Sequence, residues 1–455
     1  GRKPKDWDVT TNATPEQIIE LFPKTVYENS FGTVGVKTES PSENLKVIEI
    51  TPYRVEGKYS NNRHPDEVRF STNLHDDLKR RDFTFNAIAL RLKGENDIEI
   101  VDDFGGKGDL QKGVLRTVGE PTERFEEDGL RIMRAVRLAT ELQFEIDPET
   151  ERAITECGHL LEQISEERIR DEFVKIIMSS DPERGIKSLK KFGILKYIVP
   201  ELEEGIGATQ NKAHMYDVFE HLVKTLAYSA SKDFPLETRL AALFHDIGKP
   251  ATRRFSPEKK EYTFYGHEVV GARMTKKILT RLKFPLETIS RVTTLVRWHM
   301  FFSDTETITL SAVRRMIQNV GKEQIWTLMD VRACDRIGTG RPKEAPFRLR
   351  KYHAMIDEAL RDPVSVSQLK VDGKDLMAVL ATPPGKHIGY ILHALLEEVL
   401  DDPKKNTKEY LEMRARELNL LPENKLKFLG EKGKEKKEEE DEKLVASIRK
   451  KHFVE

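Results

Sequence analysis

Cysteine is scarce in this 455-residue sequence, which contains only Cys157 and Cys334. Two isolated thiols form neither a disulfide framework nor a zinc cluster of cysteines, so they indicate a reducing compartment. Long apolar runs are absent as well: none approaches the roughly 20 residues needed to cross a bilayer, and no secretory signal opens the chain. These absences predict a cytoplasmic protein with no membrane partner.

An excess of charge of either sign is also missing. The sequence has 76 basic and 77 acidic residues, which gives a net charge of -1. Bulk charge therefore does not indicate a nucleic-acid partner, and any RNA would have to be bound by local basic faces. The sequence is long, however. A chain of 455 residues exceeds the size of one compact domain and suggests about three domains.

Residues 1–117 mix strand and helix signals. The segment Thr14-Pro15-Glu16-Gln17 predicts a helix start, with Pro15 at the first helical position and a capping box between Thr14 and Gln17. β-branched runs predict strands at 31–36, 45–51 and 98–101. This part of the chain is therefore expected to be an α+β domain with a small sheet.

Helical periodicity dominates from residue 118 to the mid-420s, because apolar residues recur there at spacings of three and four. The exception is a short hairpin expected within 251–264. Residues 431–443 are almost all Lys and Glu. A run of that composition cannot bury a core, so a solvated helix or a disordered tail is expected there.

Two carboxylates with one residue between them open the chain. Asp6 and Asp8 flank Trp7 in an expected strand, where alternation places both on one face. Such a pair can hold Mg²⁺ for nucleotidyl transfer, although a solvated strand edge is the commoner reason for the pattern. Glu49 lies in the apolar segment 47–51 and is the candidate third carboxylate, because an acid in a buried strand needs a partner. An ordinary ion pair is the alternative for Glu49.

A second polar group lies in the segment 77–87, which reads Asp-Leu-Lys-Arg-Arg-Asp-Phe-Thr-Phe-Asn-Ala. Adjacent Arg80 and Arg81, with Asp82 beside them, suit a triphosphate and a ribose hydroxyl. The alternative is a salt-bridged helix start in which Asn86 is a polar core residue.

These motifs, followed by the segment 124–137 (Arg-Phe-Glu-Glu-Asp-Gly-Leu-Arg-Ile-Met-Arg-Ala-Val-Arg), resemble the class II tRNA nucleotidyltransferases and the related bacterial poly(A) polymerases. Order and spacing match over about residues 1–425. The resemblance implies that Asp6 and Asp8 hold catalytic Mg²⁺ and that residues 101–119 form a hinge between head and neck. It also implies a nucleotide-binding group, which comprises Arg80, Arg81, Asp82, Asn86, Asp128, Arg131, Arg134 and Arg137.

Within that group, Asp128 and Arg131 are expected to select the base. Three residues apart on a helix, they would share one face. The carboxylate accepts from an exocyclic amino group and the guanidinium donates to a ring nitrogen or carbonyl, which suits C and A but leaves a buried group unpaired with U or G. The alternative is an ordinary ion pair between residues i and i+3, worth about 0.2–0.5 kcal/mol.

One family feature is not found in this sequence. Members carry a Gly-Gly-x-Val-Arg-Asp segment before the Asp-x-Asp motif, and its glycines let backbone amides approach the triphosphate. Gly105-Gly106 belongs to the hinge and is no substitute. We therefore expect the chain to be an N-terminally incomplete copy.

Histidines and aspartates in the middle of the chain form the second constellation. His245-Asp246 ends an apolar helix and is followed by Gly248 and Pro250. A single buried His is usually structural, but this pair, with His and Asp at wide spacings on either side, resembles the HD phosphohydrolase superfamily. The resemblance implies one divalent metal ion, such as Ni²⁺ or Mn²⁺, on His221, His245, Asp246 and Asp335. His267 and His299 would suit a second metal ion.

The predicted architecture is an α+β nucleotidyltransferase head with a small polymerase-beta-like sheet, then an all-α neck, an HD body and a helical tail. Its expected bounds are head 1–117, neck 118–205, HD domain 206–345, tRNA-binding tail 346–425 and charged extension 426–455. The predicted function is template-independent addition of C and A to a tRNA 3′ end from CTP and ATP. A poly(A) polymerase or an A-adding enzyme is one alternative, and an HD phosphohydrolase with an inactive RNA-binding head is another.

Overall fold

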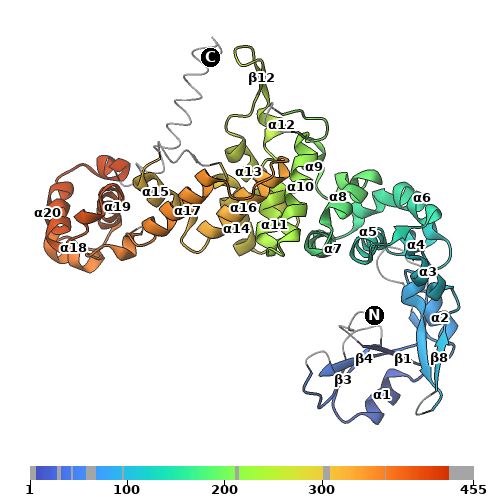
Figure 1. Ribbon diagram of the computed structural model, residues 1–455. Helices are drawn as coiled ribbons and strands as arrows, with labels where there is room; N and C mark the ends of the chain where they lie inside the picture. Colours follow the sequence, from blue (N-terminus) through green and yellow to red (C-terminus); the bar gives the residue numbers. More distant parts are fainter. Residues whose placement is uncertain are drawn as a thin grey trace. The chain divides into compact units, whose positions relative to one another are not determined.

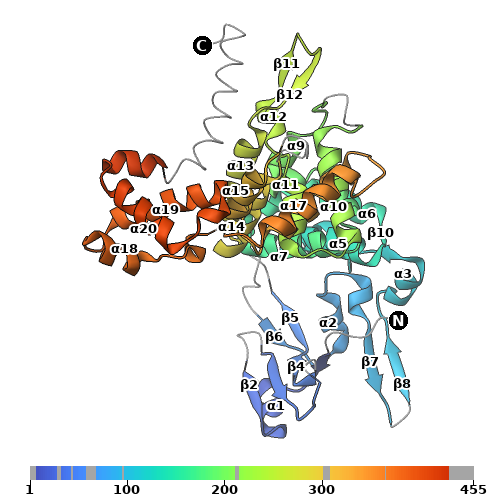
Figure 2. The same cartoon turned by 60° about the vertical axis from the view of Figure 1, so that its left-hand side comes forward.

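The computed structural model describes residues 7–27, 32–42, 45–57, 68–94, 97–210, 215–300, 308–363 and 365–429 (Figures 1 and 2). Its contacts divide the chain into two compact units, 1–200 and 201–455. No described helix combines the length and the apolar character needed to cross a membrane.

The first unit begins with a four-stranded sheet in the order β1-β4-β3-β2, in which β1 pairs parallel to β4 and the other pairs are antiparallel. Helix α1 packs on one face through Ile18 against Val34, Val36 and Ile50. The capping box predicted at Thr14 is confirmed. The elements are β1 (Asp8–Thr11), α1 (Pro15–Leu21), β2 (Thr25–Tyr27), β3 (Val34–Lys37) and β4 (Val47–Pro52).

Two antiparallel ribbons and a short helix complete the α+β part. A second small core of Leu74, Leu78, Ala87 and Val118 holds helix α2 against the base of the β7–β8 ribbon. The elements are β5 (Arg54–Glu56), β6 (Val68–Phe70), α2 (Leu74–Lys79), the 3₁₀ helix η2 (Thr84–Ala87), β7 (Ala89–Leu92), β8 (Ile98–Val101), α3 (Gly106–Lys112) and β9 (Val114–Leu115).

The rest of the first unit is helical, as the periodicity predicted. Helix α5 is central and packs against α7 and α8, while α4 packs against α6. The elements are α4 (Pro121–Glu127), α5 (Leu130–Leu142), β10 (Glu145–Ile146), α6 (Pro148–Cys157), η3 (Gly158–Gln163), α7 (Glu166–Met178), α8 (Pro182–Lys191) and η4 (Leu195–Tyr197).

The second unit opens with a helical core in which α10 packs against α11 and α16, and α13 packs against α14. The predicted hairpin is present as β11–β12 and stands out from these helices in both views (Figures 1 and 2). The elements are α9 (Pro200–Glu203), α10 (Val218–Ser231), α11 (Leu236–Phe244), α12 (Lys249–Thr252), β11 (Arg254–Ser256), β12 (Glu261–Thr263), α13 (His267–Arg281), α14 (Leu286–Trp298), α15 (Leu310–Val320) and α16 (Ile325–Gly338).

Further helices follow at the carboxyl-terminal end of this unit. Helix α17 packs on α15, and α18, α19 and α20 pack on one another. The elements are α17 (Phe347–Ala359), η5 (Val366–Gln368), α18 (Gly373–Leu380), α19 (Lys386–Asp401), η6 (Pro403–Lys405) and α20 (Lys408–Asn419).

Candidate active sites

The register of the head sheet places Asp8 directly beside Glu49. Strands β1 and β4 pair Asp8 with Glu49, and β3 pairs Gly35 with Glu49. Because alternate residues of a strand face opposite sides, these three positions lie on the face away from α1. Gly35 contributes no side chain and is itself buried, whereas Asp8 and Glu49 are exposed. Asp6, which alternation predicts on the same face, lies outside the described residues.

Glu49 is exposed, so the expectation that it lies in a buried strand is wrong. The apolar residues of β4 gave that impression, but Ile50 alone of the aliphatic ones is buried, and it faces α1. An exposed carboxylate does not need a partner to offset burial. Glu49 therefore stays a candidate for the catalytic group because of its place beside Asp8, not because of its burial.

Asp77 organises the two arginines that follow it. Its buried carboxylate accepts from Arg80 Nε at 2.9 Å and from Arg81 Nη2 at 3.3 Å. It also accepts from Thr10 Oγ1 at 3.4 Å, and Thr10 lies on β1, two residues after Asp8. Asp77 therefore joins the arginine pair to the strand of the candidate catalytic carboxylate. Asp77 was assigned no role from the sequence, although an acid three and four residues before two arginines is a recognisable helix pattern.

Asp82 joins the α+β part to helix α5. Its Oδ2 accepts from both Nε and Nη2 of Arg134, at 2.8 and 2.6 Å, and its Oδ1 accepts from Asn86 Nδ2 at 3.0 Å. Burial raises the pKa of the Asp82 carboxyl, but Arg134, Asn86 and Arg131 together outweigh burial and lower the pKa below its ordinary value. Asp82, Asn86 and Arg134 thus form one connected group of charged and polar side chains.

Asp128 does not lie on a helix with Arg131, so the prediction of a shared helix face is wrong. Helix α4 ends at Glu127, Asp128 has an extended backbone (φ -147°, ψ 104°), and α5 begins at Leu130. Gly129 has a helical backbone, so the break lies at Asp128 alone. A Cβ at position 129 would lie 3.1 Å from Leu160 Cβ and 3.2 Å from its carbonyl oxygen, which favours glycine there.

Arg168, a residue that sequence reasoning missed, holds the Asp128 carboxylate. Its Nη1 and Nη2 donate to the two carboxylate oxygens at 3.2 and 2.7 Å. This forked pair fixes the plane of the carboxylate. Arg168 is 40 residues away on α7, so no local pattern could have paired it with Asp128.

Arg131 donates to acceptors on helix α4 and to one that directly follows helix α2. Its Nη1 donates to the Arg124 carbonyl at 3.1 Å and to the Glu127 carboxylate, and its Nη2 donates to the Arg80 carbonyl at 3.0 Å. The expected base-selecting arginine therefore touches the backbone of an expected phosphate-binding residue.

Arg137 occupies a different setting from the other predicted nucleotide ligands. Its Nε donates to the nearly buried Glu172 on α7, and its Nη1 donates to Glu141 at 2.9 Å. These contacts tie α5 to α7 and leave Arg137 between two acids. Its assignment to the nucleotide site remains a prediction.

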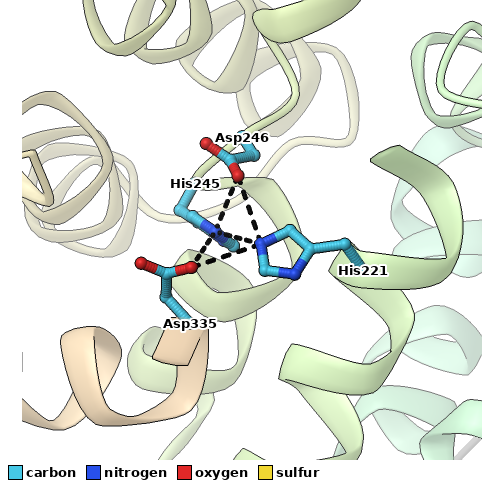
Figure 3. A group of neighbouring side chains, drawn as sticks. All are labelled: His221, His245, Asp246 and Asp335. Carbon is cyan, nitrogen blue, oxygen red and sulfur yellow. Dashed lines mark hydrogen bonds and ion pairs between the residues drawn. The ribbon is translucent and has the colours of Figure 1, made fainter. Parts of the chain in front are cut away.

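The second candidate site is a buried cluster of imidazoles and carboxylates in the other unit. His221 comes from α10, His245 and Asp246 directly follow α11, and Asp335 comes from α16 (Figure 3). His221 Nε2 lies 3.2 Å from Asp246 Oδ2 and 3.3 Å from Asp335 Oδ1. His245 Nε2 lies 3.2 Å from the same Asp246 oxygen. All four residues are buried, and their ligand atoms lie within 4.8 Å of one another.

The other carboxylate oxygen of Asp246 faces a second group. His267 Nε2 lies 3.1 Å from Asp246 Oδ1 and His299 Nε2 lies 3.5 Å from it. Asp246 therefore stands between the two histidine pairs, one on each of its oxygens. This is the arrangement expected of a carboxylate that bridges two metal ions.

Backbone acceptors orient the imidazoles of His245, His267 and His299 for metal binding. Nδ1 of His245 donates to the Ala242 carbonyl at 2.9 Å, and Nδ1 of His267 and of His299 each donate at 2.7 Å, to the Phe264 and Val296 carbonyls. With the proton on Nδ1, the Nε2 lone pair points into the cluster. This donor set of imidazole nitrogens and carboxylate oxygens fits a divalent transition metal, which would displace a proton from Nε2 on binding.

The electrostatics of the cluster follow from its buried acids. Burial alone would lower the pKa of His245 and raise that of Asp246. The Asp246 and Asp335 carboxylates together outweigh burial and raise the pKa of His245 to about 10. Lys249, together with His245 and His221, holds the pKa of Asp246 well below its usual range. Burial lowers the pKa of His299 to about 4. The cluster thus concentrates negative charge that protons or bound cations must balance.

Lys249 was also missed by the sequence reasoning. It is almost fully buried, and its Nζ lies 2.5 Å from Asp246 Oδ2 and donates to Gln210 Oε1 at 2.6 Å. It follows the His-Asp pair by three to four residues, so the local signal was present in the sequence. An ammonium at this place balances the Asp246 charge and orients its carboxylate.

Family models match the chain in three places. The model described as the poly A polymerase head domain matches residues 1–116, and that of a probable RNA- and SrmB-binding site of polymerase A matches residues 143–206. An HD domain model matches residues 213–340.

Individual proteins match over longer stretches. The A-adding tRNA nucleotidyltransferase of Deinococcus radiodurans is 37% identical over 342 residues, which cover 73% of this chain and 76% of that protein. The CCA-adding enzyme of Ligilactobacillus salivarius is 30% identical over 91% of this chain and 88% of its own length. Among solved structures, the CCA-adding enzyme of Bacillus stearothermophilus in complex with CTP is 27% identical, with a TM-score of 0.67 over 92% of this chain and 90% of that one.

Proposed function

Since this chain belongs to the family of tRNA nucleotidyltransferases that carry a poly(A) polymerase head, we propose that it adds C, C and A to the 3′ end of tRNA from CTP and ATP. The proposal covers the substrate and the order of addition. It rests on the relatives that share this architecture and on the arrangement of the residues around Arg80 and Arg131.

The observation that carries the proposal is the contact between Arg131 Nη2 and the Arg80 carbonyl, at 3.0 Å. Arg80 belongs to the arginine pair that Asp77 holds beside β1, and Arg131 belongs to the expected base-selecting pair. Groups suited to a triphosphate and groups suited to a base edge therefore meet at one contact. A nucleoside triphosphate has both parts in one molecule, whereas an inorganic phosphate or a free base has only one.

The expected chemistry is attack by the tRNA 3′-hydroxyl on the α-phosphate, with pyrophosphate as the leaving group. Asp8, with Asp6 and Glu49 as predicted partners, would hold Mg²⁺, which when bound stabilises the charge that develops on the attacking and leaving oxygens. Arg80 and Arg81 would neutralise the triphosphate. Asp128 would accept from the exocyclic amino group that C and A share, and Arg131 would donate to the neighbouring ring acceptor.

The deciding experiment measures label incorporation from each of the four nucleotides, with Mg²⁺, into tRNA transcripts that lack CCA or end in CC. We expect C, C and then A on the first transcript, A alone on the second, and nothing from UTP or GTP. Addition of A to the CC transcript only would support the A-adding alternative. A long run of A on any RNA would support the poly(A) polymerase alternative, and no incorporation would contradict all three.

The buried cluster supports a second activity, the metal-dependent hydrolysis of a phosphate ester. The observation that favours it is the placement of the histidine pairs on the two oxygens of Asp246, which fits two divalent ions such as Ni²⁺ or Mn²⁺. A bound metal pair supplies an activated water at neutral pH. Lys249 would hold the bridging carboxylate in place.

Replacing Asp246 by Asn should weaken Ni²⁺ and Mn²⁺ binding by at least about 100-fold, because the bridging carboxylate would lose its charge. Metal content after equilibrium dialysis measures the effect directly. A metal ion should also raise the melting temperature of the parent protein but not of this variant, since a ligand stabilises only the state that binds it. Asp357→Asn changes an exposed acid of α17 in the same unit and serves as the control. Equal metal content in both variants would rule out the metal centre.

A further inference from the structure

The β11–β12 hairpin joins the two halves of the buried cluster. It begins five residues after Lys249 and ends shortly before His267, and it stands out from the helices of its unit in both views (Figures 1 and 2). A lone two-stranded ribbon is marginally stable in water. Something other than a buried core must therefore hold this one together.

Aromatic and cationic side chains hold the ribbon. Phe255 and Tyr262 are cross-strand partners, with their rings edge to face and 5.5 Å apart. The Arg253 guanidinium stacks on the Tyr262 ring at 3.6 Å, and Arg253 also donates to Thr209. Near the tip, Lys259 Nζ donates to the Tyr265 hydroxyl at 2.9 Å. These contacts make a rigid aromatic surface from short strands.

The outer part of that surface is accessible and basic. The Phe255 side chain is 58% exposed and Tyr265 is 43% exposed. Residues 253–265 contain four cations and two acids, in a chain whose net charge is -1. Exposed rings among excess cations have the composition of surfaces that bind single-stranded nucleic acid, where bases stack and phosphates pair with Lys and Arg. A duplex would use the cations but hides its base faces, and a protein partner of this chemistry would have to be acidic.

We propose that the β11–β12 hairpin binds single-stranded RNA, with a base stacked on Phe255 and the flanking phosphates paired with Lys259 and Lys260. The inference rests on the proposed function only in taking RNA as the ligand. The hairpin would hold a single-stranded RNA segment at the part of the protein that connects Asp246 to His267. This role does not require the buried cluster to hydrolyse a substrate.

Two conservative variants separate this role from a structural one. Phe255→Leu keeps an apolar partner for Tyr262 but removes the ring face. Lys260 has a left-handed backbone (φ 50°), so Lys260→Asn removes the charge while Asn tolerates that conformation. The matched controls are Phe347→Leu, at an exposed phenylalanine of α17, and Lys283→Asn, at a lysine with the same backbone conformation (φ 55°).

The experiment uses the full chain and a fluorescent oligouridylate that carries 4-thiouridine for cross-linking. We expect a cross-link within residues 253–265 and binding weakened at least about 5-fold by Phe255→Leu, as one lost base stack predicts. Lys260→Asn should reduce the slope of log K against log salt by about 0.7. Equal melting temperatures would show that the variants are folded.

Affinities and salt slopes equal to those of the controls, or a cross-link confined to other segments, would overturn the proposal. So would an equal loss of binding to a duplex, because that would show phosphate contacts without stacking. Nucleotide incorporation measured on the same preparations tests the proposed addition of C and A separately from RNA binding by the hairpin. A chain that adds no nucleotide but cross-links through the hairpin would contradict only the proposed function, and the reverse would contradict only the hairpin.

Discussion

Asp8→Asn should lower nucleotide addition to tRNA by about 10³-fold or more, because it removes a charged metal ligand at the reacting phosphate while keeping the size of the side chain. The register of β1 and β4 places the exposed Asp8 beside the exposed Glu49, and Thr10 of the same strand donates to Asp77, which holds the two arginines. Initial rates of CTP incorporation at saturating tRNA measure the loss. RNA binding should stay within a few-fold, since the contribution of Asp8 is expected at the phosphate.

Two further variants test whether the effect is specific to Asp8. Glu20→Gln changes an exposed acid of α1 in the same domain and should leave the rate unchanged. Glu49→Gln should reduce the rate if Glu49 acts with Asp8, and should have little effect if Glu49 forms only an ion pair. A rate within ten-fold of the parent for Asp8→Asn would remove Asp8 from the catalytic group.

Local signals in the sequence predicted the elements of the head well. The capping box at Thr14, the strands ending near Thr51 and Val101 and the hairpin near 254–263 depend on neighbouring residues and were found where expected. The sequence also identified His221, His245, Asp246 and Asp335, which the fold brings within ligand distance of one another.

Contacts between distant segments could not be predicted in this way. The pairing of Asp82 with Arg134 and of Asp128 with Arg168 joins residues 52 and 40 positions apart, and each pairing depends on how helices pack. The helix break at Asp128 was also missed, because residues 124–137 contain no proline and Gly129 itself has a helical backbone. The burial of Glu49 was misjudged because a short apolar strand does not reveal which of its faces is covered.

The packing contact at Asp128 leads to the second large effect. Arg168→Lys should raise the use of UTP and GTP relative to CTP and ATP by about 10- to 100-fold, which corresponds to the ~1.5–3 kcal/mol of a charged hydrogen-bonded pair. Arg168 donates through both Nη atoms to Asp128, and a lysine cannot reproduce that fork. An Asp128 carboxylate free to rotate would no longer demand an exocyclic amino group at one fixed place.

The control for this prediction lies two residues further along the same helix. Arg170→Lys makes the same substitution where the guanidinium pairs with the exposed Asp171, and it should leave nucleotide preference unchanged. Single-nucleotide incorporation assays with each variant give the ratio of kcat/KM for the four nucleotides. A loss of CTP and UTP use in equal proportion would show that Arg168 only stabilises the neck. A selective gain for UTP and GTP would identify Arg168 as the residue that positions Asp128 for base selection, because a purely structural role cannot change one nucleotide against another.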